Sequence, residues 1–300
     1  MVNDEKVFVW CDADLDGAVS YLILSWCYDR KLPVRSTTVK NFGTEFSTWA
    51  KHNDIDQYDK IFILDIDVAN TGIIDQVDRD NIVIIDHHRT HVVKKDEYKK
   101  ASAILKETTS CSKLVWQIYK SVAKDLSDEQ RYMTLLADDY DSYELNLPHS
   151  YDLNIIYWSL QGDRISKFYE NYINGFRPFT GYEKNIISLH NKKFEHIKKT
   201  SRPYKCFLHI KDKPVRFIAA TADACINELA DHLIKKYKSD VGVIINLNTQ
   251  RFSLRKSNNC EVDLSELINK IGSGGGHEYA AGGVIDDKFL TFSKLLIPAK

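Results

Sequence analysis

Acidic and histidine side chains follow three short apolar runs in the N-terminal half of the 300-residue chain. These groups are Asp12, Asp14 and Asp16 after residues 7–10, Asp65 and Asp67 after residues 61–64, and Asp86, His87 and His88 after residues 82–85. Carboxylates combined with an imidazole nitrogen form a ligand set suited to Mn²⁺ or Mg²⁺. So many acids in one place would repel one another unless cations neutralised them. The pattern therefore favours two metal ions that support hydrolysis at phosphorus.

The three apolar runs also predict the elements that position these side chains. They are rich in β-branched and aromatic residues, which is typical of buried parallel strands. Residues 17–28 and 110–120 have the apolar spacing of helices. This alternation predicts an α/β fold, with an N-terminal parallel sheet covered by helices on both faces. Ligands of such sheets bind beyond the carboxyl ends of the strands, so we expect the acidic groups to meet there.

The chain is expected to form two domains. A polar, basic, helix-like stretch at residues 182–202 separates an N-terminal domain, residues 1–181, from a C-terminal domain, residues 203–300. The C-terminal part has strand candidates of its own at residues 206–210, 215–219, 241–245 and 251–255. We expect a helical linker that joins the first domain to a second, smaller α/β unit.

A glycine-rich segment lies near the C-terminus. Six glycines occupy residues 272–283, and His277 follows the consecutive glycines Gly274, Gly275 and Gly276. Glycines let backbone N–H groups approach a ligand closely, which indicates a phosphate or nucleotide cradle. A flexible linker is the alternative. It is disfavoured because the segment continues as His-x-x-Ala-Ala-Gly and leads into another apolar stretch.

The composition argues against some classes of function but does not identify one. The net charge of −1 gives no overall basic field, which weakens the case for a non-specific DNA coat protein. The six cysteines are scattered and include no Cys-x-x-Cys pair, so we expect reduced thiols in a cytoplasmic protein. No apolar run approaches the length of a membrane span, and the N-terminus lacks the pattern of a signal peptide.

Two other interpretations of the first acidic group are weaker. Residues 12–17 begin like a calcium loop, but position twelve of that loop is Ile23, not Glu, and an apolar strand precedes it. Asp14 also resembles the nucleophile of haloacid-dehalogenase-type phosphatases, with Asp138 and Asp139 as their late acidic motif. That interpretation leaves the histidine pair and the glycine segment without a role.

The motifs together resemble those of the DHH phosphoesterases with an associated DHHA1 domain. The residues that carry the resemblance are Asp12, Asp14, Asp16 and Gly17, then Asp65, then Asp86, His87 and His88, then the Asp139 region, and finally Ser253, Leu254 and Arg255 with residues 274–282. They occur in the order of the family and span residues 12 to 283. The form Asp-x-Asp-x-Asp in the first motif is similar to that of RecJ-type exonucleases.

The resemblance implies roles for individual residues. Those expected to hold two Mn²⁺ ions, or Mg²⁺ in their place, are Asp14, Asp16, Asp65, His87 and Asp139, with Asp12 either a ligand or a supporting group. Asp65 would bridge the ions, although Asp67 in its motif, and Asp138 and Asp141 in the last, remain open choices. His88 would contact the scissile phosphate, and Asp86 would orient an imidazole. Phosphate binding is expected from Arg255, His277 and the amides of Gly274, Gly275 and Gly276.

The resemblance also implies an activity. We expect a metal-dependent phosphodiesterase that hydrolyses short oligonucleotides or single-stranded nucleic-acid ends to mononucleotides. A cyclic-dinucleotide phosphodiesterase and a weakly catalytic nucleotide-binding module are the alternatives. The expected partners are an oligonucleotide, a single-stranded nucleic acid or a dinucleotide, with no membrane, and a homodimer is left open. Tyr140, Tyr143, Trp158 and Tyr279 are candidates for stacking on bases, although aromatic residues are more often part of a core.

Overall fold

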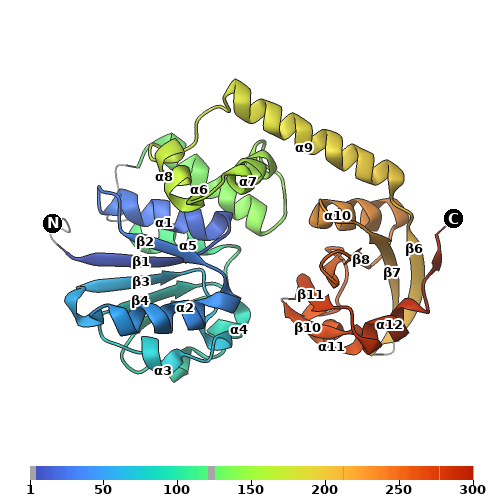
Figure 1. Cartoon of the computed structure of the whole chain (residues 1–300), viewed down its shortest axis with the longest axis horizontal. Coiled ribbons are helices and arrows are strands. Elements are labelled where there is room, and N and C mark those ends of the chain that lie inside the picture. The colour runs from blue at the N-terminus through green and yellow to red at the C-terminus, as the bar shows by residue number, and fades with distance from the viewer. Residues whose placement is uncertain (1–4, 121–125, 212, 277, 300) are drawn as a thin grey trace. The chain divides into compact units, whose positions relative to one another are not determined.

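The chain forms two compact units, Met1–Ile187 and Ser188–Lys300. The structure is a computed structural model that describes residues 5–120, 126–211, 213–276 and 278–299. Figure 1 labels the helices and strands of both units. Each unit has its own sheet and its own hydrophobic core.

The first unit is built on a five-stranded sheet in the order β2-β1-β3-β4-β5. All its neighbouring strands are parallel. The strands are β1 (Val7–Asp12), β2 (Val34–Thr37), β3 (Lys60–Leu64), β4 (Ile82–Asp86) and β5 (Ser102–Leu105). The three apolar runs of the sequence are therefore the three central strands, which is where a sheet buried on both faces needs unbroken apolar sequence.

Helices cover both faces of this sheet (Figure 1). One face carries α1 (Leu15–Cys27), α5 (Cys111–Tyr119), α6 (Asp128–Asp141), α7 (Ser150–Ser159) and α8 (Arg164–Tyr172). The other face carries α2 (Val39–His52) and the short α3 (Ile74–Val77). Side chains alternate between the two cores along each strand: Val9 and Cys11 pack with α1, whereas Phe8 and Trp10 pack with α2.

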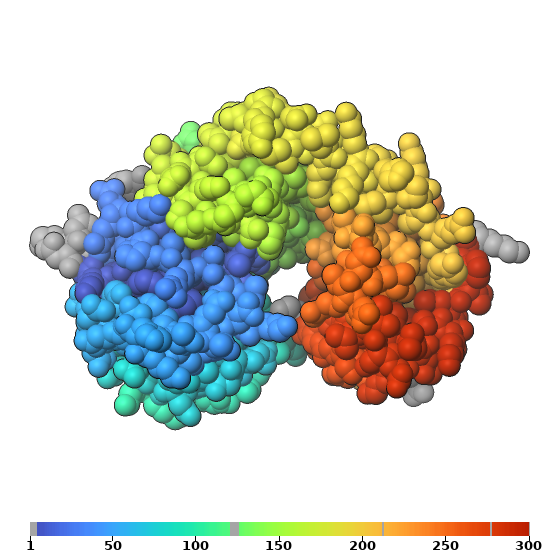
Figure 2. Space-filling model, viewed as in Figure 1, coloured from blue at the N-terminus to red at the C-terminus, as the bar shows by residue number. Residues whose placement is uncertain are grey.

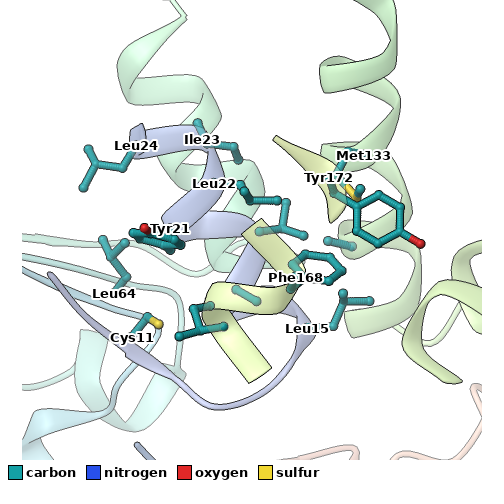
Figure 3. Packing of buried hydrophobic residues seen from close by; sticks show 14 of the residues in the cluster. Cys11, Leu15, Tyr21, Leu22, Ile23, Leu24, Leu64, Met133, Phe168 and Tyr172 are labelled. Atoms are coloured by element: carbon teal, nitrogen blue, oxygen red, sulfur yellow. The ribbon is translucent and has the colours of Figure 1, made fainter. Parts of the chain in front are cut away.

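Helix α1 is apolar around most of its circumference because it is enclosed on all sides. Figure 3 shows Tyr21 beside Leu64 on the side of the sheet and Leu15 near Phe168 on the side of the outer helices. Every residue from Leu15 to Ser25 is buried. The rigid placement of α1 fixes the first acidic motif, which lies at its N-terminal end.

Short turns of helix connect the remaining strands of the first unit. They are the 3₁₀ turns η1 (Ile55–Gln57), η2 (Val68–Asn70) and η3 (Lys95–Glu97), and the helix α4 (Arg89–Val92). Both η2 and α4 begin directly after an acidic strand end, so their backbones hold the residues of the second and third motifs in place.

The second unit has a seven-stranded sheet in the order β10-β11-β9-β8-β7-β6-β12. Its strands are β6 (Tyr204–Ile210), β7 (Lys213–Thr221), β8 (Val241–Asn246), β9 (Arg251–Lys256), β10 (Ser273–Gly276), β11 (Ala280–Val284) and β12 (Ile297–Pro298). Among the described strands of this second sheet, only β7 and β8 pair in parallel. Helix α10 (Ile226–Tyr237) packs on one core, and α11 (Leu264–Ile271) and α12 (Asp287–Ser293) pack on the other. The predicted fold class, two α/β units joined by a helix, is confirmed.

The connecting helix is α9 (Gly181–Thr200), which starts in the first unit and ends in the second. Its exposed side chains include Tyr182 and Leu189, and its yellow surface is visible in Figure 2. Among the residues that the structure describes, no helix has the length and apolar character needed to cross a membrane.

Candidate active site

The acidic ends of three adjacent strands meet at one edge of the first sheet. In the parallel register, Leu64 of β3 pairs with both Cys11 of β1 and Ile85 of β4. The residue that follows in each strand therefore lies at the same level of the sheet. Those residues are Asp12, Asp65 and Asp86. The predicted convergence of the three acidic groups is thus a consequence of strand register.

His87 points its Nε2 atom at three carboxylates. This nitrogen lies 3.4 Å from Asp65 Oδ1, 3.5 Å from Asp141 Oδ2 and 3.9 Å from Asp16 Oδ2. The other ring nitrogen, Nδ1, is 3.2 Å from the carbonyl oxygen of Thr108. A carbonyl oxygen only accepts, so Nδ1 is the donor of this hydrogen bond and Nε2 is the nitrogen that faces the carboxylates. Such a carbonyl partner is the usual way in which proteins orient a metal-binding histidine.

Asp16 is held by the N-terminus of α5. Its two carboxylate oxygens accept hydrogen bonds from the backbone N–H groups of Cys111, at 2.6 Å, and Ser112, at 2.9 Å. These N–H groups have no partner within the helix, and the helix dipole favours a negative charge at this end. Asp16 is 2% exposed, so its position beside His87 is fixed by buried hydrogen bonds rather than by solvent.

The loop before α1 explains the spacing of the first motif. Asp14 is the N-cap of α1 and accepts a hydrogen bond from Gly17 N at 3.0 Å. A Cβ atom at position 17 would lie 2.5 Å from the carbonyl oxygen of Asp12. Only glycine allows the helix to approach the strand end this closely, and the approach brings all three aspartates of the motif to one place.

Asp65 is a buried acid with an unsatisfied oxygen. Its Oδ1 atom accepts no hydrogen bond from the described residues, and the side chain is almost fully buried. Burial raises the pKa of Asp65 well above its usual range, and the charges of Asp16 and Asp14 raise it further. Its backbone also adopts a left-handed conformation, with φ of +61°, which is uncommon outside glycine and is often found at functional sites. A bound cation would satisfy this oxygen and remove the electrostatic penalty.

Asp67, the other acid of this strand end, has a different set of contacts. Its Oδ2 atom accepts hydrogen bonds from Asn70 and Thr90, which ties η2 to α4. Its Oδ1 atom is also buried without a hydrogen bond from the described residues. Asp65, not Asp67, lies beside the Nε2 atom of His87.

Asp86 orients two histidines at once. Its Oδ1 atom is 2.6 Å from His88 Nδ1, and its Oδ2 atom is 2.7 Å from His91 Nδ1. The Nε2 atom of His91 is hydrogen-bonded to the hydroxyl of Tyr98 at 2.6 Å. All of Asp86 and His91 is buried. The sequence interpretation missed His91, although a third histidine in the run from residue 86 to residue 91 was a visible signal.

The Asp86–His88 pair keeps a positive charge on His88. Burial alone would lower the pKa of His88, but the charge of Asp86 and its hydrogen bond outweigh burial and raise the pKa to about 10. Burial opposes the charge on Asp86 as well, but His88 and His91 outweigh it and lower the pKa of Asp86 below its usual range. A protonated His88 beside the carboxylates can donate to an anionic oxygen of a phosphate.

The last acidic motif lies in the final turn of α6, and its three aspartates have different partners. Asp141 faces His87. Asp138 holds α5, because it accepts from Ser110 Oγ at 2.8 Å and lies 3.1 Å from Lys113 Nζ. Partial desolvation of its carboxyl group raises the pKa of Asp141 above its usual range, as do the charges of Asp16 and Asp14.

Asp139, the residue predicted as a ligand from this motif, has its oxygens engaged elsewhere. Oδ1 accepts from Asn146 N at 2.8 Å, and Oδ2 accepts from Leu147 N at 3.0 Å and Ser150 Oγ at 2.6 Å. These contacts fasten the loop between α6 and α7. The structure brings Asp141, not Asp139, to the histidine.

The pKa values of Asp12 and Asp14, the other acids of the first motif, are also raised. Burial raises the pKa of Asp12 to about 7, and the charge of Asp14 adds to the shift. Burial and the charge of Asp16 raise the pKa of Asp14, against the hydrogen bond from Gly17. Carboxylates arranged in this way disfavour their own ionised forms until a cation is present.

The predicted phosphate-binding residues belong to the second unit. Arg255 lies on β9, and its Nη2 atom donates to Asn227 Oδ1 of α10 at 2.8 Å. Gly274, Gly275 and Gly276 form β10, which is an edge strand paired with β11 and not an open loop. On an edge strand, alternate N–H groups point away from the neighbouring strand and can bind a ligand. His277 lies outside the described residues.

The chain matches two family models. The N-terminal domain of the DHH family matches residues 6–138, and the DHHA1 domain matches residues 215–297. The two matches together cover well over half of the chain. No curated protein matches the sequence.

Several solved structures share the fold. An exopolyphosphatase-related protein from Bacteroides fragilis is 17% identical, with 98% of this chain and 92% of that chain covered and a TM-score of 0.56. The pGpG-specific phosphodiesterase PggH from Vibrio cholerae is 14% identical, with 97% and 96% covered and a TM-score of 0.59. An exonuclease RecJ bound to manganese is 10% identical, with 97% and 88% covered and a TM-score of 0.55. At these identities the likeness establishes the fold. From the two domain matches and this fold, the chain belongs to the DHH family of phosphoesterases and carries a DHHA1 domain.

Proposed function

We propose that this protein is a metal-dependent phosphodiesterase that hydrolyses short oligonucleotides or single-stranded nucleic-acid ends to mononucleotides. One observation carries the proposal. The Nε2 atom of His87 lies within 3.9 Å of carboxylate oxygens from Asp16, Asp65 and Asp141, while its Nδ1 atom is committed to a backbone carbonyl. An imidazole prepared in this way among acids fits a divalent cation better than a structural ion pair.

The donor set fits two Mn²⁺ ions, with Mg²⁺ as the second choice. The proposed ligands are Asp12, Asp14, Asp16, Asp65, His87 and Asp141. Asp141 replaces Asp139 in this set because its Oδ2 atom lies 3.5 Å from His87 Nε2, whereas the oxygens of Asp139 bind the loop that follows α6. Asp65 is the best candidate to bridge two ions, since its buried Oδ1 atom accepts no hydrogen bond from the described residues. The RecJ structure with the same fold is described as bound to manganese.

Other residues around the metal site would contact the substrate or hold the contacting residue in place. When bound, the cations would lower the pKa of a water molecule and neutralise charge on the phosphate. His88, kept protonated by Asp86, would donate to an oxygen of the scissile phosphate. His91 would keep Asp86 in place, because it occupies the second carboxylate oxygen.

The second unit would supply substrate binding. We assign residues 1–181 to catalysis, residues 182–202 to the linker helix and residues 203–300 to the substrate-binding domain. Arg255 presents a guanidinium already oriented by Asn227, and β10 presents glycine N–H groups at a sheet edge. Both groups suit the phosphates of a nucleotide.

The proposed substrates are nucleotides. The DHHA1 domain favours nucleotides, and one solved structure with this fold is described as a pGpG-specific phosphodiesterase. Linear dinucleotides therefore belong among the substrates, together with short oligomers of either sugar. The six cysteines are free thiols, which favours a reducing compartment such as the cytoplasm.

A substrate panel tests the proposal. Purified protein is assayed with Mn²⁺ or Mg²⁺ on linear dinucleotides, DNA and RNA oligomers, cyclic dinucleotides and pyrophosphate. We expect mononucleotide release from the linear substrates, and its loss in His87→Ala. Asp75→Asn, at an exposed position of α3, is the matched control and should keep full activity. Nucleotide binding without turnover in saturating Mn²⁺ would contradict the proposed activity and support a nucleotide-binding module instead.

A further inference from the structure

A second group of metal-ligating side chains lies in the second unit and has no part in the proposed reaction. It consists of His190 on α9, and Cys225 and Glu228 at the start of α10. One ligand atom from each residue lies within 4.8 Å of the other two. All three residues are partly buried, so the group is sheltered but open to ions from solvent.

The packing of α9 on α10 brings the three side chains together. Phe194 and Ile197 of α9 pack against the core that includes Leu229 and Leu233 of α10. His190 precedes Phe194 by one helical turn, so it lies on the same side of α9 and faces the N-terminal end of α10. The contact is therefore set by a hydrophobic interface and does not depend on flexible surface side chains.

The distances match those between ligands of one tetrahedral ion. The Nε2 atom of His190 is 3.3 Å from Glu228 Oε1 and 3.9 Å from Cys225 Sγ. Zinc bonds of about 2.3 Å to sulfur and about 2.0–2.2 Å to nitrogen and oxygen, at tetrahedral angles, place N and O about 3.4 Å apart and N and S about 3.6 Å apart. The distance from His190 to Glu228 therefore fits a tetrahedral ion as it stands, the distance from His190 to Cys225 exceeds the expected value by a few tenths of an ångström, and Cys225 lies within 4.8 Å of Glu228.

The side chain of Cys225 does not cap α10, although the residue lies at the start of this helix. Cys225 is the N-cap of α10 and adopts a left-handed conformation, with φ of +50° and ψ of +43°. Its side chain makes no hydrogen bond to the α10 backbone as a cap, and its sulfur lies beside His190 instead.

We propose that His190, Cys225 and Glu228 bind a divalent cation of the zinc class through Nε2, Sγ and a carboxylate oxygen, with water as the fourth ligand. Thiolate and imidazole together select borderline ions such as Zn²⁺ and disfavour Mg²⁺, which distinguishes this site from the oxygen-rich group of the first unit. On binding, the Cys225 thiol releases its proton to solvent, and the thiolate and carboxylate balance the charge of the ion. The ion would pin the N-terminal end of α10 to α9. This inference does not rest on the proposed phosphodiesterase activity.

Cobalt is the probe that tests the site, because Co²⁺ bound to a thiolate shows a charge-transfer absorption band that Co²⁺ on carboxylate and imidazole ligands lacks. The full-length protein is titrated with Co²⁺ and then with Zn²⁺. We expect the thiolate band to appear as this site fills, whether or not the oxygen-rich group of the first unit also takes up Co²⁺, and to disappear as Zn²⁺ displaces the cobalt. Zn²⁺ should also raise the thermal unfolding midpoint of the wild type more than that of Cys225→Ser.

Variants identify the ligands. Cys225→Ser should abolish the thiolate band, and His190→Gln should weaken cobalt binding by about tenfold or more. Cys27→Ser, which removes another partly buried thiol at the end of α1, is the matched control and should leave the band unchanged. If Cys225→Ser does not fold, His190→Gln and Glu228→Gln decide the result. The proposal is overturned if the wild type shows no thiolate band, or if the band is unchanged in Cys225→Ser or in both other variants.

Discussion

The separate contacts of Asp139 and Asp141 predict opposite outcomes for the same chemical change at the two positions. Each aspartate is replaced by asparagine, which keeps the shape and removes the charge. Asp139→Asn should destabilise the fold and keep the chemistry of the folded fraction. Asp141→Asn should remove activity and leave the metal-free fold at least as stable as the wild type.

The magnitude for Asp139→Asn follows from its three hydrogen bonds, two from backbone N–H groups and one from a hydroxyl. An amide NH₂ group cannot accept, so it leaves donors unpaired around at least one of the two former oxygens. Hydrogen bonds to a charged group contribute about 1.5–3 kcal/mol each, and the contributions overlap. We therefore expect a loss of about 2–4 kcal/mol in the free energy of unfolding, which corresponds to a fall of roughly 5–15 °C in the unfolding midpoint.

Asp141→Asn has the reverse sign because the raised pKa of Asp141 means that its charge opposes folding when no cation is bound. Removing the charge relieves repulsion from Asp16 and Asp14. With metal present, the lost ligand should reduce kcat by about 10²-fold or more, as when one strong transition-state contact is removed. The assay pairs thermal unfolding in chelator with nucleotide release in Mn²⁺. The assigned roles of the two aspartates are refuted if Asp139→Asn abolishes turnover at an unchanged unfolding midpoint while Asp141→Asn stays active.

Three other predictions concern pH, orientation and substrate binding. The pKa of Asp12 is raised from 3.8 to about 7 and that of Asp65 is also raised, so the folded state binds more protons than the unfolded chain and the metal-free protein should lose stability between about pH 4 and pH 7. Unfolding midpoints in chelator at pH 5 and pH 8 check this, and a higher midpoint at pH 8 would contradict it. His91→Phe should lower kcat by about 10–100-fold with little change in KM, because Asp86 loses the group that holds its second oxygen; an unchanged kcat would rule out this positioning role. Arg255→Ala should raise KM for an oligonucleotide by about 10–100-fold, the worth of a charge-assisted hydrogen bond, with a smaller effect on kcat; steady-state kinetics with an unchanged KM would exclude Arg255 from substrate binding.

The sequence was sufficient to predict the position of the first sheet and its acidic edge. Parallel strands in register bring their last residues to one level, so Asp12, Asp65 and Asp86 could be placed together from the three apolar runs alone. The requirement for glycine at position 17 could not be seen in the same way. It depends on a close approach between the start of α1 and the carbonyl of Asp12, which only three-dimensional packing reveals.

Other features depended on geometry that spacing does not determine. Asp139 and Asp141 are two positions apart at the end of α6, which turns about 200° between them, so one faces His87 and the other faces the next loop. Nothing in the motif itself indicates which aspartate points inward. The glycine segment suggested a cradle, but hydrogen bonds to β11 make residues 273–276 a strand. His190 and Cys225 are 35 positions apart, and only the packing of α9 on α10 brings them together.

The most direct test of the central claim is anomalous X-ray diffraction from crystals grown with Mn²⁺. We predict a manganese peak within bonding distance of His87 Nε2, with ligands from Asp16, Asp65 and Asp141 and none from Asp139. A second peak bridged by Asp65 would complete the two-ion site. Absence of a peak beside His87 at saturating Mn²⁺ would show that the proposed metal site is wrong. Coordination by Asp139 in place of Asp141 would show that the proposed ligand set is wrong.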